Sequence, residues 1–332
     1  MGNGGRVARL GIGLLVAGWL AAALPASAAP TRGQAADGVE ERTETFVDRT
    51  RDTPALSEPK QAKQDHRTLK TTIWSPGEPG TYPLVVFAHG CGGHGTDAAA
   101  MLRGWAAAGY VVAAPDFPIS SLDTPGVACT SDVAQQPDDV SFVITSVLKL
   151  DRRKGRDGLG GIVDRKRIGI AGQSLGAVTT LGTAFRSCCY DKRLDAAISY
   201  AGTPLIQVTD FKPMTTPLLL VHGDADPTVR YSGSQSAFNR AKGPRYLLTV
   251  LGGDHGTHLQ DGTEVGAAVQ RTTIDFLDGY LKDDAAAIDR IQTDAVVPGA
   301  TTLQACPTPG ACSGTAVSPV VGQFDGPWLM ST

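Results

Sequence analysis

The chain has 332 residues, with 30 Lys and Arg against 33 Asp and Glu, which gives a formal net charge of −3 and a pI of about 6.1. This balance argues against a nucleic-acid-binding protein, because such proteins usually carry a surplus of basic residues. Hydrophobic residues make up 42% of the chain and charged residues 19%, so most of it is expected to fold. One α/β domain of about 250 residues with tails fits this length, as do two small domains.

The first 28 residues have the pattern of an export signal. Arg6 and Arg9 form a basic region, residues 10–24 an apolar stretch, and Ala26–Ala28 a small-residue cleavage site. An uncleaved anchor is the alternative, since the apolar stretch and the small residues after it, about 20 together, are long enough to span a bilayer. Pro25 and the Ala-x-Ala pattern favour cleavage near Ala28. We therefore expect a secreted, extracellular protein with no stable membrane span in its mature form.

The remaining chain divides into three segments by composition. Residues 29–65 are rich in charged and polar residues and predict a solvated N-terminal extension. Residues 66–284 alternate apolar runs with amphipathic stretches, which indicates one α/β domain. Residues 285–332 are rich in Pro, Gly and Thr and predict a tail that lies over the domain.

Short apolar runs within residues 66–284 predict strands that are covered on both faces, as in a mainly parallel sheet. Stretches with helical apolar spacing lie between them and predict helices on both faces of that sheet. The predicted strands are residues 84–88, 110–114, 167–171, 196–200, 218–221 and 246–250, and the predicted helices are residues 97–108, 138–150, 175–186, 232–241 and 265–281. Residues 201–217 are too few to hold a large lid, so any site at this edge should be open.

The most informative motif is a serine between a predicted strand and a predicted helix, in Gly172-Gln173-Ser174-Leu175-Gly176. A serine on such a tight turn needs small residues two places to either side, because larger side chains would collide with backbone. Gly172 and Gly176 meet that need. The turn exposes the Ser174 hydroxyl beside the N-terminus of a helix, whose free N–H groups favour developing negative charge.

A serine nucleophile needs a base, and the base needs an orienting carboxylate. Both residue types follow two later predicted strands, in His222–Val229 and in Gly252–His258. In a parallel sheet these loops share the carboxyl edge with Ser174, where ligands bind. The order serine, aspartate, histidine is the one expected of a triad on such a sheet.

These motifs resemble those of the α/β-hydrolase superfamily. Within it the chain is similar to secreted dienelactone-hydrolase-like and platelet-activating-factor-acetylhydrolase-like esterases, which adjoin bacterial cutinases and polyester hydrolases. The resemblance covers residues 66–282 and includes His89–Gly93, Gly109–Asp116 and the three loops above. It implies an α/β-hydrolase fold with a mainly parallel central sheet, helices on both faces and no large lid insertion.

The resemblance also assigns the two partners of Ser174. The family's Gly-x-x-Asp pattern falls on Asp226, so Asp224 is expected to be a turn residue. The Gly-x-x-His pattern falls on His255, which is favoured over His258 as the base. These two histidines could also suggest a metal pair, but no clustered third ligand is evident in the sequence.

The loop after the first of these predicted strands, residues 89–93, is here called the oxyanion loop. In the family the residue after its His-Gly pair offers a backbone N–H to the substrate oxygen, which implies Cys91 as one donor and Leu175 as the other. His89 has the alternative role of holding the shape of the loop. Dienelactone hydrolases proper use a cysteine nucleophile, whereas this chain has Ser174, and Gln173 stands where His or Trp is common. Both departures concern the substrate rather than the chemistry.

The sequence thus predicts a serine hydrolase that cleaves carboxylic esters through an acyl-enzyme, with no metal or organic cofactor. Its expected partner is a small-molecule or polymeric ester, and no nucleic acid. One alternative is a catalytically idle hydrolase fold used for binding. Another is an aspartyl-phosphate phosphatase, because Asp224–Thr228 matches Asp-x-Asp-x-Thr, although that motif usually ends the first strand of its domain.

Six cysteines in an exported chain suggest disulfides. The expected fold places Cys91 and Cys129 on the carboxyl edge and favours a bridge between them, with a free Cys91 thiol as the alternative. Cys306 and Cys312 most simply pair with each other. Cys188 and Cys189, which follow the predicted helix 175–186, form either an adjacent bridge or two buried thiols.

Overall fold

The computed structural model describes residues 1–2, 32–34, 38–56, 62–124, 128–153, 155, 158–204, 212–308 and 311–313. Apart from Met1 and Gly2, the predicted export signal lies outside the described residues, as does the end of the predicted tail. Within the described ranges, no helix is long and apolar enough to cross a membrane.

The described residues form one mixed sheet flanked by helices. The strands are β1 (Arg32–Gln34), β2 (Val39–Asp48), β3 (Arg67–Pro76), β4 (Tyr82–Ala88), β5 (Val111–Pro115), β6 (Val163–Gln173), β7 (Leu194–Tyr200), β8 (Leu218–Gly223), β9 (Arg245–Val250), β10 (Thr301–Thr308) and β11 (Ala311–Ser313). The helices are α1 (Ala99–Ala107), α2 (Cys129–Asp132), α3 (Gln136–Asp151), α4 (Leu175–Phe185), α5 (Ser232–Arg240), the 3₁₀ helix η2 (Thr257–Leu259), α6 (Glu264–Leu281) and α7 (Ala285–Asp294).

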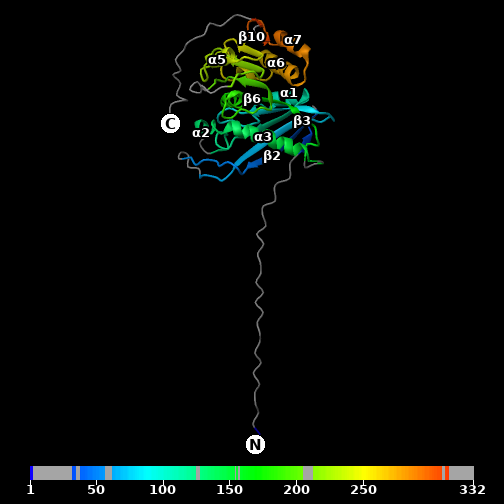
Figure 1. Ribbon diagram of the computed structural model, residues 1–332, viewed down its shortest axis with the longest axis vertical. Coiled ribbons are helices and arrows are strands. Elements are labelled where there is room, and N and C mark those ends of the chain that lie inside the picture. Colours follow the sequence, from blue (N-terminus) through cyan, green and yellow to red (C-terminus); the bar gives the residue numbers. More distant parts are fainter. Residues whose placement is uncertain are drawn as a thin grey trace.

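The strand order of the sheet is β1-β2-β3-β5-β4-β6-β7-β8-β9-β10-β11. Strands β5, β4, β6, β7, β8 and β9 are mutually parallel, whereas β3 pairs antiparallel with β5 and β10 pairs antiparallel with β9. Figure 1 shows β2 and β3 on one side of the molecule and β10 on the other. The carboxyl ends of the six parallel strands therefore lie along one edge, which is called the carboxyl edge below.

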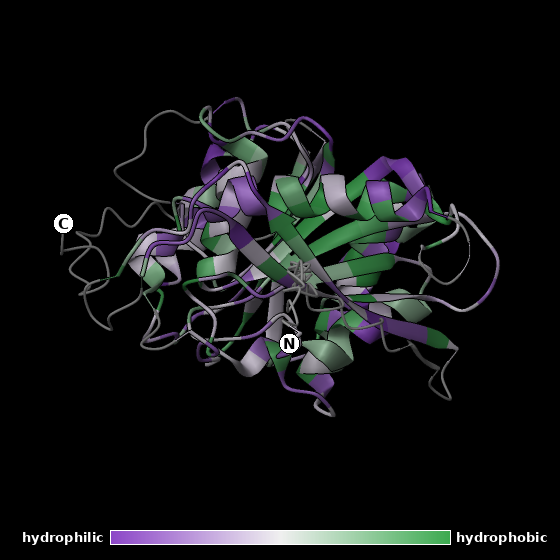
Figure 2. Ribbon diagram, turned by 90° about the horizontal axis from the view of Figure 1, so that it is seen from below, coloured by the Kyte–Doolittle hydropathy of each residue, from purple (hydrophilic) through white to green (hydrophobic). Residues whose placement is uncertain are grey.

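Two hydrophobic cores cover the two faces of the sheet, because successive side chains of a buried strand point to opposite faces. In β4, Val85 and Phe87 belong to the core formed with α1 and α6, whereas Leu84 and Val86 belong to the core formed with α3 and α4. Figure 2 shows the hydrophobic central strands between these helices. This arrangement confirms the predicted mainly parallel sheet with helices on both faces.

The predicted strands correspond to β4 through β9 and the predicted helices to α1, α3, α4, α5 and α6. Sequence analysis missed β2 and β3 at one margin of the sheet and β10 at the other. Strand β2 lies in the segment for which it predicts a solvated extension. Ten register pairs join β2 to β3, from Val39–Pro76 to Asp48–Arg67, so this part of the segment belongs to the sheet.

The charged side chains of β2 have partners, which explains how a polar sequence can form a strand here. Glu41 accepts hydrogen bonds from the Trp74 indole at 2.8 Å and from Arg103 at 2.9 Å. Arg42, which is 6% exposed, donates to the carbonyl of Gly158 at 2.8 Å. These contacts replace the apolar alternation that would have identified a strand.

The segment predicted as a tail begins with two further elements. Helix α7 packs beside α6 (Figure 1), and β10 extends the sheet past β9. Cys306 at the end of β10 is bonded to Cys312 in β11, as the sequence predicts. Residues beyond Ser313 lie outside the described part.

The other four cysteines also form two disulfides, of which the sequence favoured the first and left the second open. Cys91 is bonded to Cys129 with their Cα atoms 5.6 Å apart, within the range that a bridge requires. Cys188 and Cys189 form the adjacent bridge rather than two buried thiols, and Cys188 is exposed.

A buried ion cluster joins β3 to helices α2 and α3. The guanidinium of Arg67, which is 0% exposed, donates to Asp139 at 2.7 Å and to Asp132 at 2.8 Å. Asp132 also accepts from the backbone N–H and the hydroxyl of Ser120, at 3.1 and 2.9 Å. The cluster therefore fixes the loop that follows β5 at the carboxyl edge.

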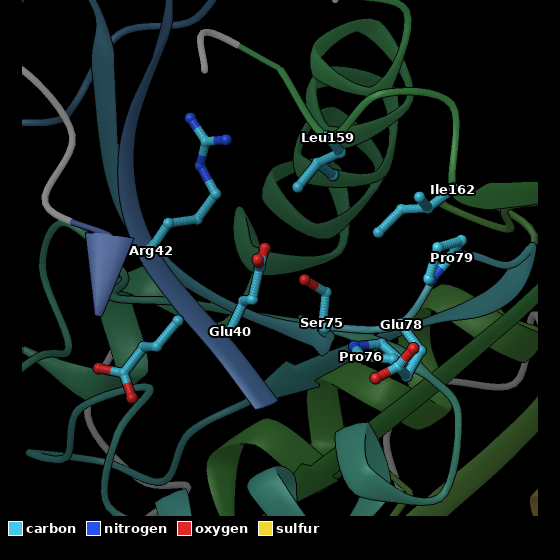
Figure 3. A pocket seen from close by; sticks show the side chains of 10 residues that line it. Glu40, Arg42, Ser75, Pro76, Glu78, Pro79, Leu159 and Ile162 are labelled. Atoms are coloured by element: carbon cyan, nitrogen blue, oxygen red, sulfur yellow. The ribbon is translucent and has the colours of Figure 1, made fainter. Parts of the chain in front are cut away.

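A cavity of about 150 Å³ lies at the opposite edge of the sheet. Figure 3 shows the Glu40 carboxylate and the Ser75 hydroxyl facing Leu159 and Ile162 across it. Because β3 runs antiparallel to β5, Ser75 at its end lies at the amino edge of the parallel strands. This cavity is therefore remote from the predicted site.

Replacing Arg67 by leucine should destabilise the fold, because it leaves the buried carboxylate of Asp132 without its counter-charge and that of Asp139 with Arg51 alone. Removing one partner of a buried pair typically costs about 3–5 kcal/mol, which should appear as a lower urea midpoint. The control is Lys63→Ala, which removes an exposed pair with Asp52 whose side chains are 62% and 50% exposed. That variant should unfold near the wild-type midpoint, and equal midpoints for the two variants would contradict a structural role for the cluster.

Candidate active site

Ser174 occupies a strained turn between β6 and α4. Its backbone has φ 57° and ψ −116°, a conformation that residues other than glycine rarely adopt. The Ser174 N–H donates to the carbonyl of Tyr200 on β7 at 2.9 Å, which ties the turn to the neighbouring strand. The hydroxyl side chain is thereby directed away from the sheet at its carboxyl edge.

The glycines at either side of Ser174 allow this turn because helix α4 lies directly against the sheet. A Cβ on Gly176 would lie 2.0 Å from the carbonyl oxygen of Ala88, and a Cβ on Gly172 would lie 2.2 Å from the carbonyl oxygen of Gly176. Neither contact can be relieved by a side-chain rotation, since both involve backbone atoms. These close approaches explain why the motif requires small residues at both positions.

The structure brings Ser174, His255 and Asp226 together from the loops after β6, β9 and β8. Ser174 Oγ lies 2.8 Å from His255 Nε2, and His255 Nδ1 lies 2.7 Å from Asp226 Oδ2. The His255 side chain is 23% exposed, whereas that of Asp226 is 0% exposed. The Ser174 hydroxyl therefore contacts a partly exposed histidine, and the other ring nitrogen of that histidine is held by a buried carboxylate.

The Asp226 carboxylate is held by four hydrogen-bond donors. Oδ1 accepts from the backbone N–H groups of Thr228 at 2.7 Å and Val229 at 2.9 Å. Oδ2 accepts from His255 at 2.7 Å and lies 3.1 Å from His222 Nε2. Burial alone raises the pKa of Asp226, but the hydrogen bonds from the two histidines and the two N–H groups outweigh it and hold that pKa well below its usual range.

Asp224 has the turn role that the sequence predicts. It is exposed, and its Oδ1 accepts a hydrogen bond from the backbone N–H of Gly252 at 2.6 Å. This contact joins the loop after β8 to the loop after β9. Asp224 thus helps to hold the loops that carry Asp226 and His255.

His258 lies in the same loop as His255 but in a different environment. Its ring is stacked on that of Tyr200, with centroids 5.6 Å apart, and it is 1% exposed. Its two ring nitrogens have no hydrogen-bond partner among the described residues. Burial lowers the pKa of His258 to about 3, so the ring is neutral at ordinary pH and does not contact Ser174.

The oxyanion loop lies against the turn at Ser174. A Cβ on Gly90 would lie 3.4 Å from the Cβ of Ser174 and 2.4 Å from Oε1 of Gln173. The N–H of Gly92 donates to the carbonyl of Ser120 at 2.8 Å, and Cys91 is bonded to Cys129. The loop is therefore fixed at Cys91 and at Gly92.

His89 determines the direction of the peptide group between Gly90 and Cys91. Its Nε2 accepts a hydrogen bond from the N–H of Phe117 at 3.0 Å, so the ring proton lies on Nδ1. Nδ1 donates in turn to the carbonyl of Gly90 at 2.6 Å. Because the C=O and N–H of a trans peptide point in opposite directions, this bond directs the Cys91 N–H away from His89.

Among the described residues, one cluster could hold a metal ion, and it does not include Ser174, Asp226 or His255. His94, Asp116 and Asp123 offer ligand atoms within 4.8 Å of one another. However, His94 faces Asp116 with Nδ1 at 3.7 Å and Asp123 with Nε2 at 3.8 Å, so its two nitrogens point to different carboxylates. Both nitrogens of His255 are already hydrogen-bonded. His255 therefore has no free ring nitrogen to offer a metal ion in this arrangement.

Sequence analysis missed one buried residue of the site, His222 on β8. Its Nε2 approaches the same oxygen of Asp226 that His255 contacts. The available signal was its position, four residues before Asp226 at the end of a strand. That signal is weak, since the strand is buried and a buried histidine there fits an ordinary core position.

The parallel sheet, the strained serine turn and the loops at its carboxyl edge define an α/β-hydrolase fold. The sequence model of the dienelactone hydrolase family matches residues 69–243, and the chain belongs to this family. Among solved structures, a ferulic acid esterase from Streptomyces cinnamoneus is similar in fold, with a TM-score of 0.56 and 20% identity over 79% of this chain and 93% of that chain. No curated protein matches this chain. Membership of the dienelactone hydrolase family makes the protein a hydrolase.

Gly176→Ala should disturb both the fold and the site, because its Cβ would push α4 away from Ala88 and displace the turn at Ser174. We expect a loss of about 1–3 kcal/mol in the free energy of unfolding and a lower rate of ester hydrolysis. The matched control is Gly256→Ala, next to His255, where a Cβ meets nothing within 4 Å and φ is −121°. Calorimetry and nitrophenyl ester assays on both variants test this, and equal behaviour of the two would show that the close approach is unimportant.

Proposed function

We propose that this protein is a secreted serine esterase that cleaves carboxylic esters through an acyl-enzyme on Ser174. The proposal rests chiefly on the continuous hydrogen-bonded line from Ser174 Oγ through His255 to the buried Asp226, with distances of 2.8 and 2.7 Å. Membership of the dienelactone hydrolase family supports it. The fold shared with a ferulic acid esterase agrees with it.

In the proposed reaction, Ser174 Oγ attacks the ester carbonyl carbon while His255 Nε2 takes its proton. Asp226 stabilises the imidazolium that forms and keeps the ring in the required orientation. When the tetrahedral intermediate collapses, His255 returns the proton to the leaving alcohol and an acyl group remains on Ser174. A water molecule, deprotonated by His255, then attacks this acyl group, and His255 returns the proton to Ser174 Oγ as the acid leaves.

The negative charge of the intermediate would be held by the N–H groups of Cys91 and Leu175. Leu175 is the first residue of α4, where an N–H has no partner within the helix. The Cys91 N–H is directed by the bond from His89 to Gly90, as described above. Loss of one such donor typically lowers the rate about 10²- to 10³-fold.

The surroundings of Ser174 suit a substrate that is reached from an open surface. The chain passes from β7 to β8 within residues 201–217, and Leu122, beside the oxyanion loop, is 64% exposed. Short acyl esters and segments of a polyester both fit such a site. Rates on nitrophenyl acetate, a feruloyl ester and a polyester film would rank these substrate classes.

Secretion is part of the proposal and has separate support. The three disulfides among the described residues are typical of an oxidising compartment. The phosphatase alternative has less support, because Asp224 is an exposed turn residue and Asp226 is held by two histidines.

Ser174→Ala should lower the hydrolysis of short-chain nitrophenyl esters about 10⁴-fold or more, since the nucleophile is removed. A fluorophosphonate probe should label the wild type at Ser174 and leave the variant unlabelled. A chelator should not change the wild-type rate. Full activity in Ser174→Ala, or loss of activity with the chelator, would disprove the mechanism. A stable, folded wild-type protein that shows neither labelling nor turnover would point to the idle binding fold.

The rate should rise with pH as His255 loses its proton, because His255 must be neutral to act as the base. Two other groups keep one protonation state at ordinary pH: the pKa of Asp226 lies well below its usual range, so its carboxylate stays ionised, and His258, with a pKa of about 3, stays neutral. His255→Ala should therefore abolish turnover, whereas His258→Ala should keep most of it. A pH profile of kcat/KM for both variants checks this, and the reverse result would move the base to His258.

A further inference from the structure

His222 is a fully buried histidine that the proposed mechanism does not use. It lies on β8 directly before Gly223, and its ring is 0% exposed. Nε2 lies 3.1 Å from Asp226 Oδ2 and 2.9 Å from the carbonyl oxygen of Val229, while Nδ1 lies 2.7 Å from the hydroxyl of Ser234 on α5. Every polar atom of the ring therefore has a partner.

These contacts determine where the ring carries its proton. Asp226 Oδ2 and the Val229 carbonyl can only accept hydrogen bonds, so Nε2 must be the donor. Nδ1 can accept from the Ser234 hydroxyl, whose oxygen also lies 3.2 Å from the carbonyl of Gly202. Whichever way the Ser234 hydroxyl points, His222 presents an N–H to the carboxylate of Asp226.

We propose that His222 is a positioning residue of the triad, which holds the Asp226 carboxylate in place and shares its Oδ2 with His255. This inference rests on the proposed function of Ser174, His255 and Asp226. A second donor on Oδ2 takes part of the negative charge that would otherwise stabilise the His255 imidazolium. His255 is thus a weaker base than it would be if it were the only histidine bonded to Asp226.

The same ring also holds the loop in which Asp226 lies. Its bond to the Val229 carbonyl fixes the segment whose N–H groups bind Asp226 Oδ1, and Tyr231 lies edge-on to the ring with centroids 5.7 Å apart. Together with His255 and the two N–H groups, His222 completes a set of four donors on the carboxylate, which can accept about four. The carboxylate therefore cannot rotate away from His255 without losing hydrogen bonds.

The polar and titratable groups around His222 and Asp226 come from three segments. From the loop after β9, His255 contacts Asp226, His258 is buried and neutral, and Asp254 is exposed to water. From α5 and the residue before it, Ser234 and Tyr231 face His222, and burial raises the pKa of Tyr231, which keeps it neutral. Asp224, in the loop after β8, is exposed.

The test compares two variants that lack a donor to Asp226 with one that keeps it. His222→Phe has no N–H, and the amide of His222→Asn is too short to reach Asp226, whereas the longer amide of His222→Gln can donate. Removing the donor should leave more charge on Oδ2, stabilise the His255 imidazolium and move the acid limb of the kcat/KM profile up by about half to one pH unit. We expect kcat to fall about 10- to 100-fold, as for the loss of a hydrogen bond to a charged group, with little change in KM. His222→Gln should keep the wild-type limb and most of kcat.

A matched control is His258→Phe, which replaces another buried histidine near the triad that makes no hydrogen bond to Asp226. It should keep the wild-type acid limb. His222→Asn can keep the contact with Ser234, so it provides a folded donor-free variant if His222→Phe does not fold. Melting temperatures and fluorophosphonate titration give the fraction of active sites in each preparation.

The outcomes separate this inference from the proposed function. If the wild type is labelled at Ser174 but the acid limb is unmoved in the donor-free variants, or moves equally in His222→Gln, then His222 only fills space and the inference is wrong. If the wild type is not labelled and Ser174→Ala is as active as the wild type, the proposed function and this inference are both wrong. A shift in the donor-free variants alone supports both.

Discussion

The site depends on the close approach of helix α4 to strand β4. The backbone of Gly176 lies so near the carbonyl of Ala88 that even a methyl group cannot be placed between them. Because α4 begins there, the chain must leave β6 through a single strained residue, and that residue is Ser174 with its positive φ. The unfavourable backbone conformation at Ser174 is thus maintained by the packing of the helix, which also places the start of α4 beside the oxyanion loop.

A second group of contacts fixes the charged end of the site. The Asp226 carboxylate is removed from water, a situation that by itself disfavours the ionised form. It remains ionised because four donors from three segments converge on it, two of them histidines, one from strand β8 and one from the loop after β9. The two ends of the site are therefore built differently, since one relies on steric exclusion and the other on satisfied hydrogen bonds in a buried position.

The centre of the fold and the residues around Ser174 could be predicted because they follow local rules. Buried parallel strands produce continuous apolar runs, and the glycines beside Ser174 report a steric need that is visible in the sequence. That the acid and the base lie in the loops after β8 and β9 followed from strand ends meeting at one edge, whereas the choice of Asp226 and His255 within those loops followed from the family resemblance. The marginal strands did not follow such rules, because the charged side chains of β2 are satisfied by partners distant in the chain, such as Trp74 and Gly158. His222 escaped prediction for a similar reason, since its contacts with Ser234 and Val229 exist only in the folded chain.

The three disulfides differ in what they contribute to the entropy of the chain. The bond between Cys91 and Cys129 spans 38 positions, whereas the other two span one and six. In the loop-closure description, a span of that size removes about 4 kcal/mol of conformational freedom from the unfolded chain, and short spans remove less. The long loop contains α1 and β5 and ends within the oxyanion loop. The disulfide that restricts the unfolded chain most is therefore made by the residue whose backbone N–H is proposed to bind the oxyanion. One bond thus stabilises the fold and orders this loop.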